Sequence, residues 1–144
     1  MLRIGRDAPS LHQARDLLAE AGLPTDDLAE DPRLRLFGLH DGDRLVGVVG
    51  VQPLAGAALL RSLAVAAGAR RRGAGTLLVA AAEDHARRSG SRDVYLLTTD
   101  AVAYFARCGY RTVSRDEAPA SLRATRQFAQ LCPASAVVMR KRLG

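Results

Sequence analysis

The segment from Leu59 to Gly90 constrains the fold most, because an apolar stretch, a glycine- and arginine-rich turn and an amphipathic stretch follow one another within it. Its first residues predict a strand that ends near Ala66, and residues 74–88 repeat apolar side chains at helical spacing. Glycines let a backbone come close to a ligand, and the free amides at the start of a helix attract anions. Together with the three arginines at 70–72, this arrangement predicts a turn that binds a pyrophosphate.

The neighbouring segments predict an α/β (α+β) fold with a mixed, mostly antiparallel sheet. Strands are expected at residues 2–4, 33–40, 45–51, 57–66 and 93–99. Short turns join the three strands between residues 33 and 66, so these strands are antiparallel. The strands at 57–66 and 93–99 flank the predicted helix, and such a strand–helix–strand crossover makes them parallel.

Helices and further strands complete the expected fold, with helices on both faces of the sheet. Helices are expected at 11–21, in a short acidic segment before Pro32, at 101–107 and within 118–131, and strands at 110–113 and 134–143. Thr99 or Asp100 is expected to cap the helix at 101–107. The 144 residues contain no repeat or linker, so residues 1–144 are expected to be one domain.

The charge distribution agrees with an anionic ligand at the glycine-rich turn. Residues 1–60 hold six Arg and nine Asp or Glu, a net charge of −3, whereas residues 61–144 hold 15 Arg or Lys and six Asp or Glu, a net charge of +9. Aromatic residues make up only 4%, and none interleave with the basic ones, so we do not expect a nucleic-acid partner.

Other function classes are excluded by what the sequence lacks. Two cysteines and three histidines without ligand spacing predict neither a metal site nor a disulfide framework. No apolar run approaches the ~20 residues that span a bilayer, and the charges from Arg3 onward differ from a signal peptide. We therefore expect no membrane partner and a cytoplasmic location. The sequence leaves homodimer formation open.

Two common phosphate-binding motifs do not match the turn. Gly68 and Gly73 have the first spacing of a nucleotide P-loop, but Ala74-Gly75 replaces its Lys-Ser/Thr pair. Gly73-Ala74-Gly75 lacks the third glycine of the dinucleotide fingerprint, because Leu78 stands there.

The turn instead resembles the Arg/Gln-x-x-Gly-x-Gly/Ala motif of the GNAT N-acetyltransferase family, as Arg70-x-x-Gly73-x-Gly75. The strand before it, the helix and buried strand after it, and the aromatic helix before Gly109-Tyr110 match the family's order of elements. The resemblance covers nearly the whole chain. It implies a single acetyltransferase domain, acetyl-CoA as cofactor, and two central parallel strands that splay apart around the thioester.

The resemblance also implies which residues bind coenzyme A. The strand backbone would pair with the pantetheine arm, the amides of the turn would hold the pyrophosphate, and the arginines would contact phosphates. The implied cofactor-binding residues are Leu63, Ala64, Val65, Arg70, Arg71, Arg72, Gly73, Ala74, Gly75, Thr76 and Phe105.

Acetyl transfer requires an amine without its extra proton, a polarised thioester carbonyl and a stabilised thiolate. By resemblance, the backbone amide of Val65 polarises the carbonyl. The family's usual acid is a tyrosine four residues before the Gly-Tyr pair, where this chain has Phe105. Tyr104, a water molecule or no dedicated acid remain as alternatives. The family's strand glutamate is also missing, which leaves a water chain, Glu20 or Glu30 as the base.

The last third of the chain resembles acetyltransferases associated with arsenic-resistance operons, through residues 98–100, 124–128 and 131–136. This resemblance implies a small-molecule amine as the acceptor, such as an arsenic-containing or other amino-acid analogue. The implied acceptor-site residues are Arg61, Ser62, Thr98, Arg123, Arg126, Cys132 and Ser135. Cys132 would either contact trivalent arsenic or be a buried structural cysteine.

Three functions follow from these observations. The first is acetyl-CoA-dependent N-acetyl transfer to a small molecule. The second is a non-catalytic coenzyme A-binding or metalloid-sensing module, which would explain the missing tyrosine and glutamate. The third is acetylation of a peptide or protein.

Overall fold

The computed structural model describes residues 1–23, 25, 28, 32–70, 72–125, 128 and 135–143. Its elements follow the order β1 (Leu2–Ile4), α1 (Leu11–Glu20), β2 (Arg35–Asp41), β3 (Arg44–Leu54), β4 (Ala57–Val65), α2 (Ala74–Arg88), β5 (Asp93–Thr98), α3 (Val102–Arg107), β6 (Arg111–Val113), α4 (Ala120–Arg123) and β7 (Val137–Arg142). Short 3-10 turns, η1 (Ala67–Ala69) and η2 (Arg115–Glu117), precede α2 and α4. No helix in the described residues is long and apolar enough to cross a membrane.

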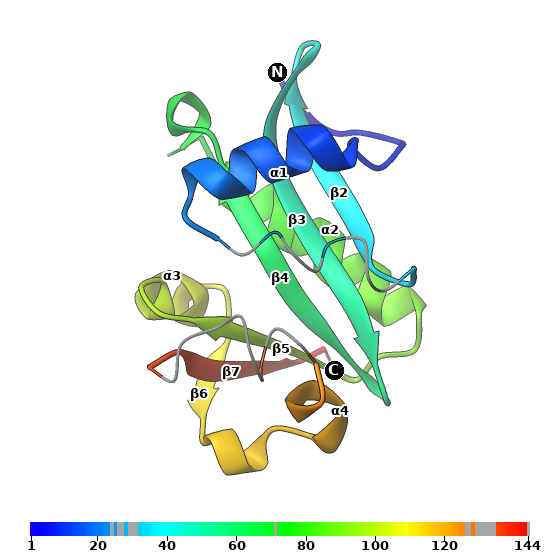
Figure 1. The fold of residues 1–144 in the computed structure, drawn as a ribbon, viewed down its shortest axis with the longest axis vertical. Coiled ribbons are helices and arrows are strands. Elements are labelled where there is room, and N and C mark those ends of the chain that lie inside the picture. The colour runs from blue at the N-terminus through cyan, green and yellow to red at the C-terminus, as the bar shows by residue number, and fades with distance from the viewer. Residues whose placement is uncertain are drawn as a thin grey trace.

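A seven-stranded mixed sheet forms the centre of this α/β domain, in the order β1-β2-β3-β4-β5-β7-β6. Every neighbouring pair is antiparallel except β4 and β5, which are parallel. Figure 1 shows β1–β4 as one twisted half of the sheet and β5, β7 and β6 as the other, with different strand directions. The predicted mixed sheet with one parallel pair is therefore confirmed.

The two halves of the sheet are joined only along a short stretch of the parallel pair. Ala57 pairs with Asp93, Ala58 with Val94 and Leu59 with Tyr95. The remaining residues of β4 and β5 do not pair with each other. The strands diverge from there, so the ends of both strands expose backbone groups and side chains toward a common gap.

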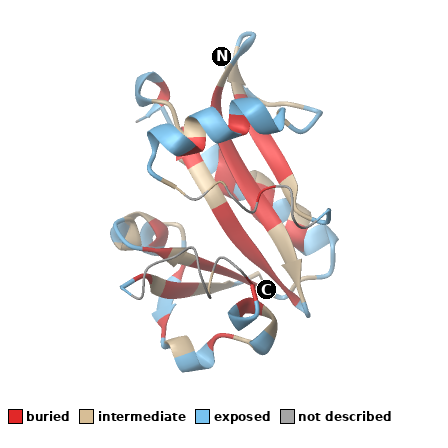
Figure 2. Cartoon of the chain, viewed as in Figure 1, coloured by how far each residue is buried: buried red, intermediate tan, exposed pale blue. Residues whose placement is uncertain are grey.

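Helices cover both faces of the sheet, as predicted. On one face, α2 packs against β2–β4 through Leu78, Val79 and Ala82 in the largest core cluster. On the other face, Ala14 and Leu18 of α1 pack with Val48 and Ala64. Figure 1 shows α1 and α2 on opposite sides of β3 and β4, and Figure 2 shows that the strands between them are buried. A third cluster joins β4, β5 and β7 to Leu122 of α4.

Three local predictions differ from the structure. Strand β3 continues through Gln52 and Pro53, where a break was expected, and turns at residues 55–56. Pro53 is tolerated close to the end of the strand, where few ladder bonds remain to be made. Strand β7 begins at Val137, later than predicted. Helix α4 lies within the predicted segment 118–131, of which residues 126–127 and 129–131 are outside the described residues.

The third difference concerns the start of α3. Neither Thr99 nor Asp100 caps this helix. The Thr98 hydroxyl oxygen accepts a hydrogen bond of 3.1 Å from the Ala101 amide, and Ala101 is the N-cap residue. The short acidic helix expected before Pro32 lies largely outside the described residues.

Candidate active site

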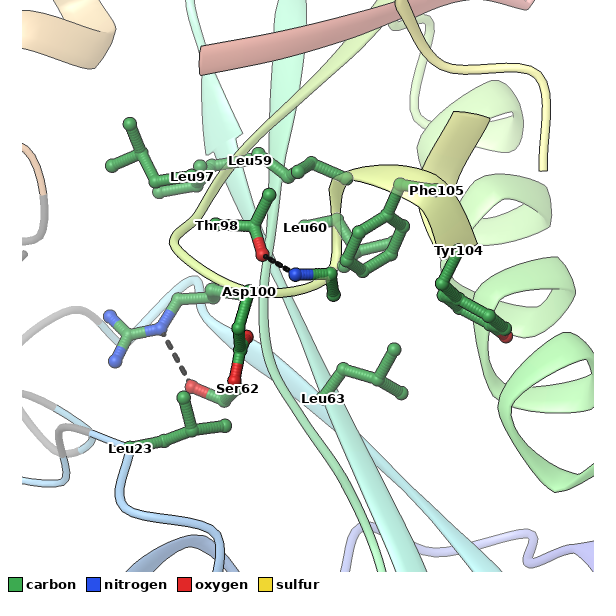
Figure 3. Close-up of a pocket in the computed structure, with 13 residues that line it drawn as sticks. Leu23, Leu59, Leu60, Ser62, Leu63, Leu97, Thr98, Asp100, Tyr104 and Phe105 are labelled. Atoms are coloured by element: carbon green, nitrogen blue, oxygen red, sulfur yellow. Dashed lines mark hydrogen bonds between the residues drawn. The ribbon is translucent and has the colours of Figure 1, made fainter. Parts of the chain in front are cut away.

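The gap between the diverging strands forms a cavity of about 160 Å³. Leu60 and Leu63 from β4 and Leu96 from β5 contribute apolar walls, and α3 adds Tyr104 and Phe105. Figure 3 shows Phe105 directed into this space and Tyr104 directed toward α2. A concave, mostly apolar space beside free strand ends is a typical small-molecule site.

A β-bulge in β4 shapes the wall of this cavity. Val48 pairs with Ala64 and Gly50 pairs with Arg61, so Ser62 and Leu63 together oppose a single residue of β3. Ser62 adopts a φ of 59°, a left-handed conformation that costs a non-glycine residue about 1–3 kcal/mol. The extra residue of the bulge reverses the alternation of the side chains along β4. Ala64 therefore faces α1 and Leu63 faces α2.

Arg61 lies beside the bulge with only 4% of its surface exposed. Its Nε donates to the Ser62 hydroxyl at 3.0 Å and its Nη1 donates to the Gln52 side-chain oxygen at 3.3 Å. The arginine stem packs beside Gly50, because a Cβ at position 50 would lie 3.4 Å from the Arg61 Cγ. The guanidinium is therefore held at the edge of the cavity, which it also lines.

A second, open cavity of about 470 Å³ runs from the first to the start of α2. Leu63, Ala64 and Val65 line it along β4, and Arg70 and Gly75 line it at the glycine-rich turn. The two cavities share four lining residues, Leu23, Leu63, Asp100 and Tyr104. The two cavities therefore adjoin, and together they are called the channel, which extends from the helix start to the gap between the strands.

The arginines of the turn have different partners. Arg70 Nε donates to the Val65 carbonyl oxygen at 3.0 Å, across the channel wall. Arg72 Nη1 contacts an Asp41 carboxylate oxygen at 2.8 Å. Hydrogen bonds from Arg72 and the amino terminus, followed by their charges, hold the pKa of Asp41 below its ordinary value. Arg71 lies outside the described residues.

Tyr104 and Phe105 occupy different environments although they are adjacent. The Tyr104 hydroxyl oxygen is buried and has no hydrogen-bond partner among the described residues. It lies against Gly75, where an added Cβ would overlap it. Burial is the main cause that raises the pKa of Tyr104. Phe105 is buried in the core against Tyr110, with ring centroids 5.8 Å apart.

A cleft between splayed parallel strands, continued to a glycine-rich helix start, is the arrangement that the resemblance implied. The model of the acetyltransferase (GNAT) family matches residues 6–110. The chain belongs to this family. The enzyme class predicted from the Arg70-x-x-Gly73-x-Gly75 motif, an acyltransferase, is thereby confirmed.

Several solved structures resemble the whole chain. N-acetylglutamate synthase from Neisseria gonorrhoeae, complexed with coenzyme A and N-acetyl-glutamate, has a TM-score of 0.81 and 25% identity, over 100% of this chain and 35% of that one. This chain thus spans about a third of that protein. A GNAT acetyltransferase from Staphylococcus aureus has a TM-score of 0.79 and 15% identity, over 100% of both chains.

A third resemblance is with the ribosomal-protein-S18-alanine N-acetyltransferase from Escherichia coli. It has a TM-score of 0.76 and 17% identity, over 100% of this chain and 95% of that one. Identities of 15–17% show the shared GNAT fold alone. Among curated protein sequences, none matches this chain.

The structure brings together most of the residues that the sequence pointed to. The channel is lined by the predicted residues Arg61, Ser62, Leu63, Ala64, Val65, Arg70, Gly75, Thr98, Tyr104 and Phe105. Gly73 and Ala74 begin α2, and Thr76 lies in its first turn beside the Tyr104 ring. Arg123 and Ser135 are exposed and line neither cavity, and Arg126 and Cys132 lie outside the described residues.

Sequence reasoning left Leu23, Gln52 and Asp100 out of the site. Leu23 follows α1 and closes the channel from the sheet's other face, a contact between distant segments that no local pattern reports. Gln52 was assigned to a turn, although it supports Arg61. Asp100 was expected as one of two possible helix caps and as part of the polar segment 98–100, without a role of its own. Its position after a buried parallel strand was the available signal, because such strand ends point to ligand sites.

Proposed function

We propose that this GNAT chain transfers the acetyl group of acetyl-CoA to the amine of a small molecule. The observation that carries the proposal is the pair of adjoining cavities, one at the start of α2 and the other between β4 and β5. The cavity at the start of α2 has polar and glycine lining residues, which suit the pyrophosphate of coenzyme A. The cavity between the strands is mostly apolar, which suits the thioester end.

The residues at the helix start fit a pyrophosphate. The first amides of α2 have no carbonyl four residues back within the helix, because the first such bond runs from Leu77 N to the Gly73 carbonyl oxygen at 3.1 Å. Gly73 has a φ of 77°, and a Cβ there would meet nothing within 4 Å, so a ligand can approach the backbone. We assign Gly73, Ala74, Gly75 and Thr76 to the pyrophosphate.

The free edge of β4 fits the pantetheine arm. Ala66 N donates to the Val46 carbonyl oxygen of β3 at 2.8 Å. Strand geometry therefore turns the N–H and C=O of Val65 the other way, toward the channel. The Val65 carbonyl accepts from Arg70 in this structure. We propose that coenzyme A takes over this strand edge and that Arg70 then turns to a phosphate, with Arg71 and Arg72 as further phosphate contacts.

Acetyl-CoA, when bound, supplies an activated acyl group. The Val65 amide would polarise its carbonyl oxygen, and the apolar walls would exclude water from it. Phe105 supplies only packing at the position where the family has its tyrosine. A proton for the thiolate would therefore come from Tyr104 after a movement away from Gly75, or from water.

The acceptor is proposed to be small, because the cavity beside the bulge holds only about 160 Å³. Arg61, Ser62 and Thr98 are its polar wall groups, and a guanidinium suits a carboxylate or another oxyanion. The narrower proposal, an arsenic-containing or other amino-acid analogue, rests on the resemblance of residues 98–100, 124–128 and 131–136. By that resemblance Arg126 and Cys132, which lie outside the described residues, would contact such an acceptor, whereas Arg123 and Ser135 line neither cavity.

A thiol-release assay with acetyl-CoA tests the proposal across a panel of amino acids, arsenic-containing analogues, simple amines and short peptides. Calorimetry with coenzyme A is run beside it. We expect coenzyme A binding and turnover with at least one small amine. Tight binding without turnover on any acceptor would instead support the non-catalytic module, and turnover confined to peptides would contradict a small acceptor.

A further inference from the structure

One carboxylate lies at the junction of the two cavities. Asp100 lines both of them, and no other acidic side chain is among their described lining residues. It follows β5 directly and precedes α3. In Figure 3, Asp100 points from this turn into the space below Thr98, on the same side as Ser62. The negative charge therefore stands where the donor and acceptor parts of the channel meet.

Local structure does not account for this carboxylate. Thr98, not Asp100, accepts the hydrogen bond from the N-cap amide of α3. Within the described residues, Asp100 makes no hydrogen bond or ion pair. Other carboxylates do pair with an arginine or lysine: Asp41 with Arg72, Glu83 with Lys141, Asp84 with Arg88 and Asp93 with Arg142. Asp100 is also exposed, so it keeps its contact with bulk water.

The walls around Asp100 select the kind of ligand that would meet it. Leucine and aromatic side chains make up most of the lining of the cavity between β4 and β5, where the acceptor is proposed to bind and which is called the acceptor cavity. A carboxylate at the mouth of an apolar cavity favours a cation with an apolar body, because the charges attract while the body leaves water. A protonated alkylamine has this combination, and it is also the form in which most amines exist at neutral pH.

We propose that Asp100 is a catalytic residue that binds the ammonium group of the acceptor and directs its proton to water. This inference rests on the proposed function. The ammonium donates a proton to the Asp100 carboxylate or to a water molecule held by it, which leaves a neutral amine. The amine nitrogen then bonds to the acyl carbon while the carbon–sulfur bond breaks.

The protons and charges balance without another reactant. The first proton leaves through Asp100 to solvent, and the second, carried by the nitrogen after it bonds to the acyl carbon, ends on the thiolate as the thiol. A carboxylate is a weaker base than an aliphatic amine. Asp100 therefore passes the proton on instead of storing it, and its exposure makes that exit direct.

Kinetics of Asp100→Asn test the role, with Asp43→Asn as matched control because Asp43 is an exposed aspartate in the β2–β3 turn. The acceptor is the best amine of the thiol-release panel. We expect kcat/KM to fall about 100-fold in Asp100→Asn near neutral pH and to stay within about twofold in the control. Asp100→Glu should restore part of the activity.

The pH dependence separates catalysis from a structural role. The defect of Asp100→Asn should shrink as the pH rises through the pKa of the acceptor's ammonium group, because the neutral amine needs no base. A defect of constant size at every pH would overturn the proposal. Equal rates in Asp100→Asn and Asp43→Asn would do the same.

Binding of n-butylammonium to the coenzyme A-saturated protein provides a measurement without turnover. An NMR titration should show about tenfold weaker binding to Asp100→Asn than to wild type, and no such change for butyrate. If the wild type does not bind coenzyme A, the proposed function itself would be refuted. If the wild type binds coenzyme A and acetylates the amine, and Asp100→Asn does both equally well, this inference alone would be refuted.

Discussion

Gly75 leaves space for the Tyr104 hydroxyl, besides its proposed contact with a phosphate. A Cβ at position 75 would overlap the hydroxyl oxygen and would lie 3.2 Å from the Tyr104 Cζ. Overpacking of this kind costs about 1–3 kcal/mol. Alanine has a helix propensity about 1 kcal/mol better than glycine, which offsets part of that cost. We therefore expect Gly75→Ala to lower the free energy of unfolding by about 1 kcal/mol, or to move Tyr104 into the channel.

Tyr104→Phe should remove this conflict, because it deletes the oxygen that a Cβ would overlap. The hydroxyl has no partner among the described residues, so its loss alone should change stability by less than about 0.5 kcal/mol. In the Tyr104→Phe background, Gly75→Ala should be neutral or slightly stabilising. The expected coupling free energy between the two sites is about 1–2 kcal/mol.

Urea denaturation of wild type, Gly75→Ala, Tyr104→Phe and the double variant measures this coupling. Calorimetry gives the affinity of each protein for coenzyme A. Gly68→Ala is the matched control, because a Cβ at position 68 would meet nothing within 4 Å. Its free energy of unfolding should stay within about 0.5 kcal/mol of wild type. Additive effects of Gly75→Ala and Tyr104→Phe would refute the steric reasoning. Weak coenzyme A binding by Gly75→Ala that Tyr104→Phe does not restore would assign Gly75 to the phosphate alone.

Three further changes test other contacts. Glu83→Gln breaks the ion pair with Lys141, whose Nζ lies 3.0 Å from a Glu83 carboxylate oxygen, and should cost about 2 kcal/mol in urea denaturation, since the lysine is partly exposed. Arg70→Ala frees the Val65 carbonyl but removes a phosphate contact, so coenzyme A affinity measured by calorimetry should fall about tenfold. Arg61→Ala should raise the KM of an anionic acceptor at least tenfold, and an unchanged KM would exclude its anchoring role.

The helix and strand pattern around the glycine-rich turn could be predicted because it depends on local periodicity. Residues 74–88 were expected as a helix, and α2 has these bounds. Apolar side chains repeat along one stripe there, and Gly90 ends the helix with a φ of 87°. The parallel pairing of β4 and β5 followed from their crossover, since that connection leaves only one arrangement of the two strands.

The chemistry beside the turn depends on contacts between distant segments, which local patterns do not report. The bulge at Ser62 arises from the register between β3 and β4, and the buried Arg61 donates to Gln52 on the neighbouring strand. A sequence shows neither the register nor which side chains meet across it. The expected cap at Thr99 or Asp100 was wrong for the same reason, because the local sequence does not show which side chain meets the Ala101 amide.

The adjacent pair Tyr104 and Phe105 connects the cofactor turn with the acceptor cavity. Successive helical residues point about 100° apart, so one ring reaches Gly75 while the other lines the gap between the strands. A tyrosine at position 105 would have placed its hydroxyl in that gap. In this chain the polar groups that line the gap come from the two strand ends, and Asp100 alone among them carries a negative charge in the described residues. The route of the acceptor's proton is therefore expected to follow the β5–α3 turn to solvent.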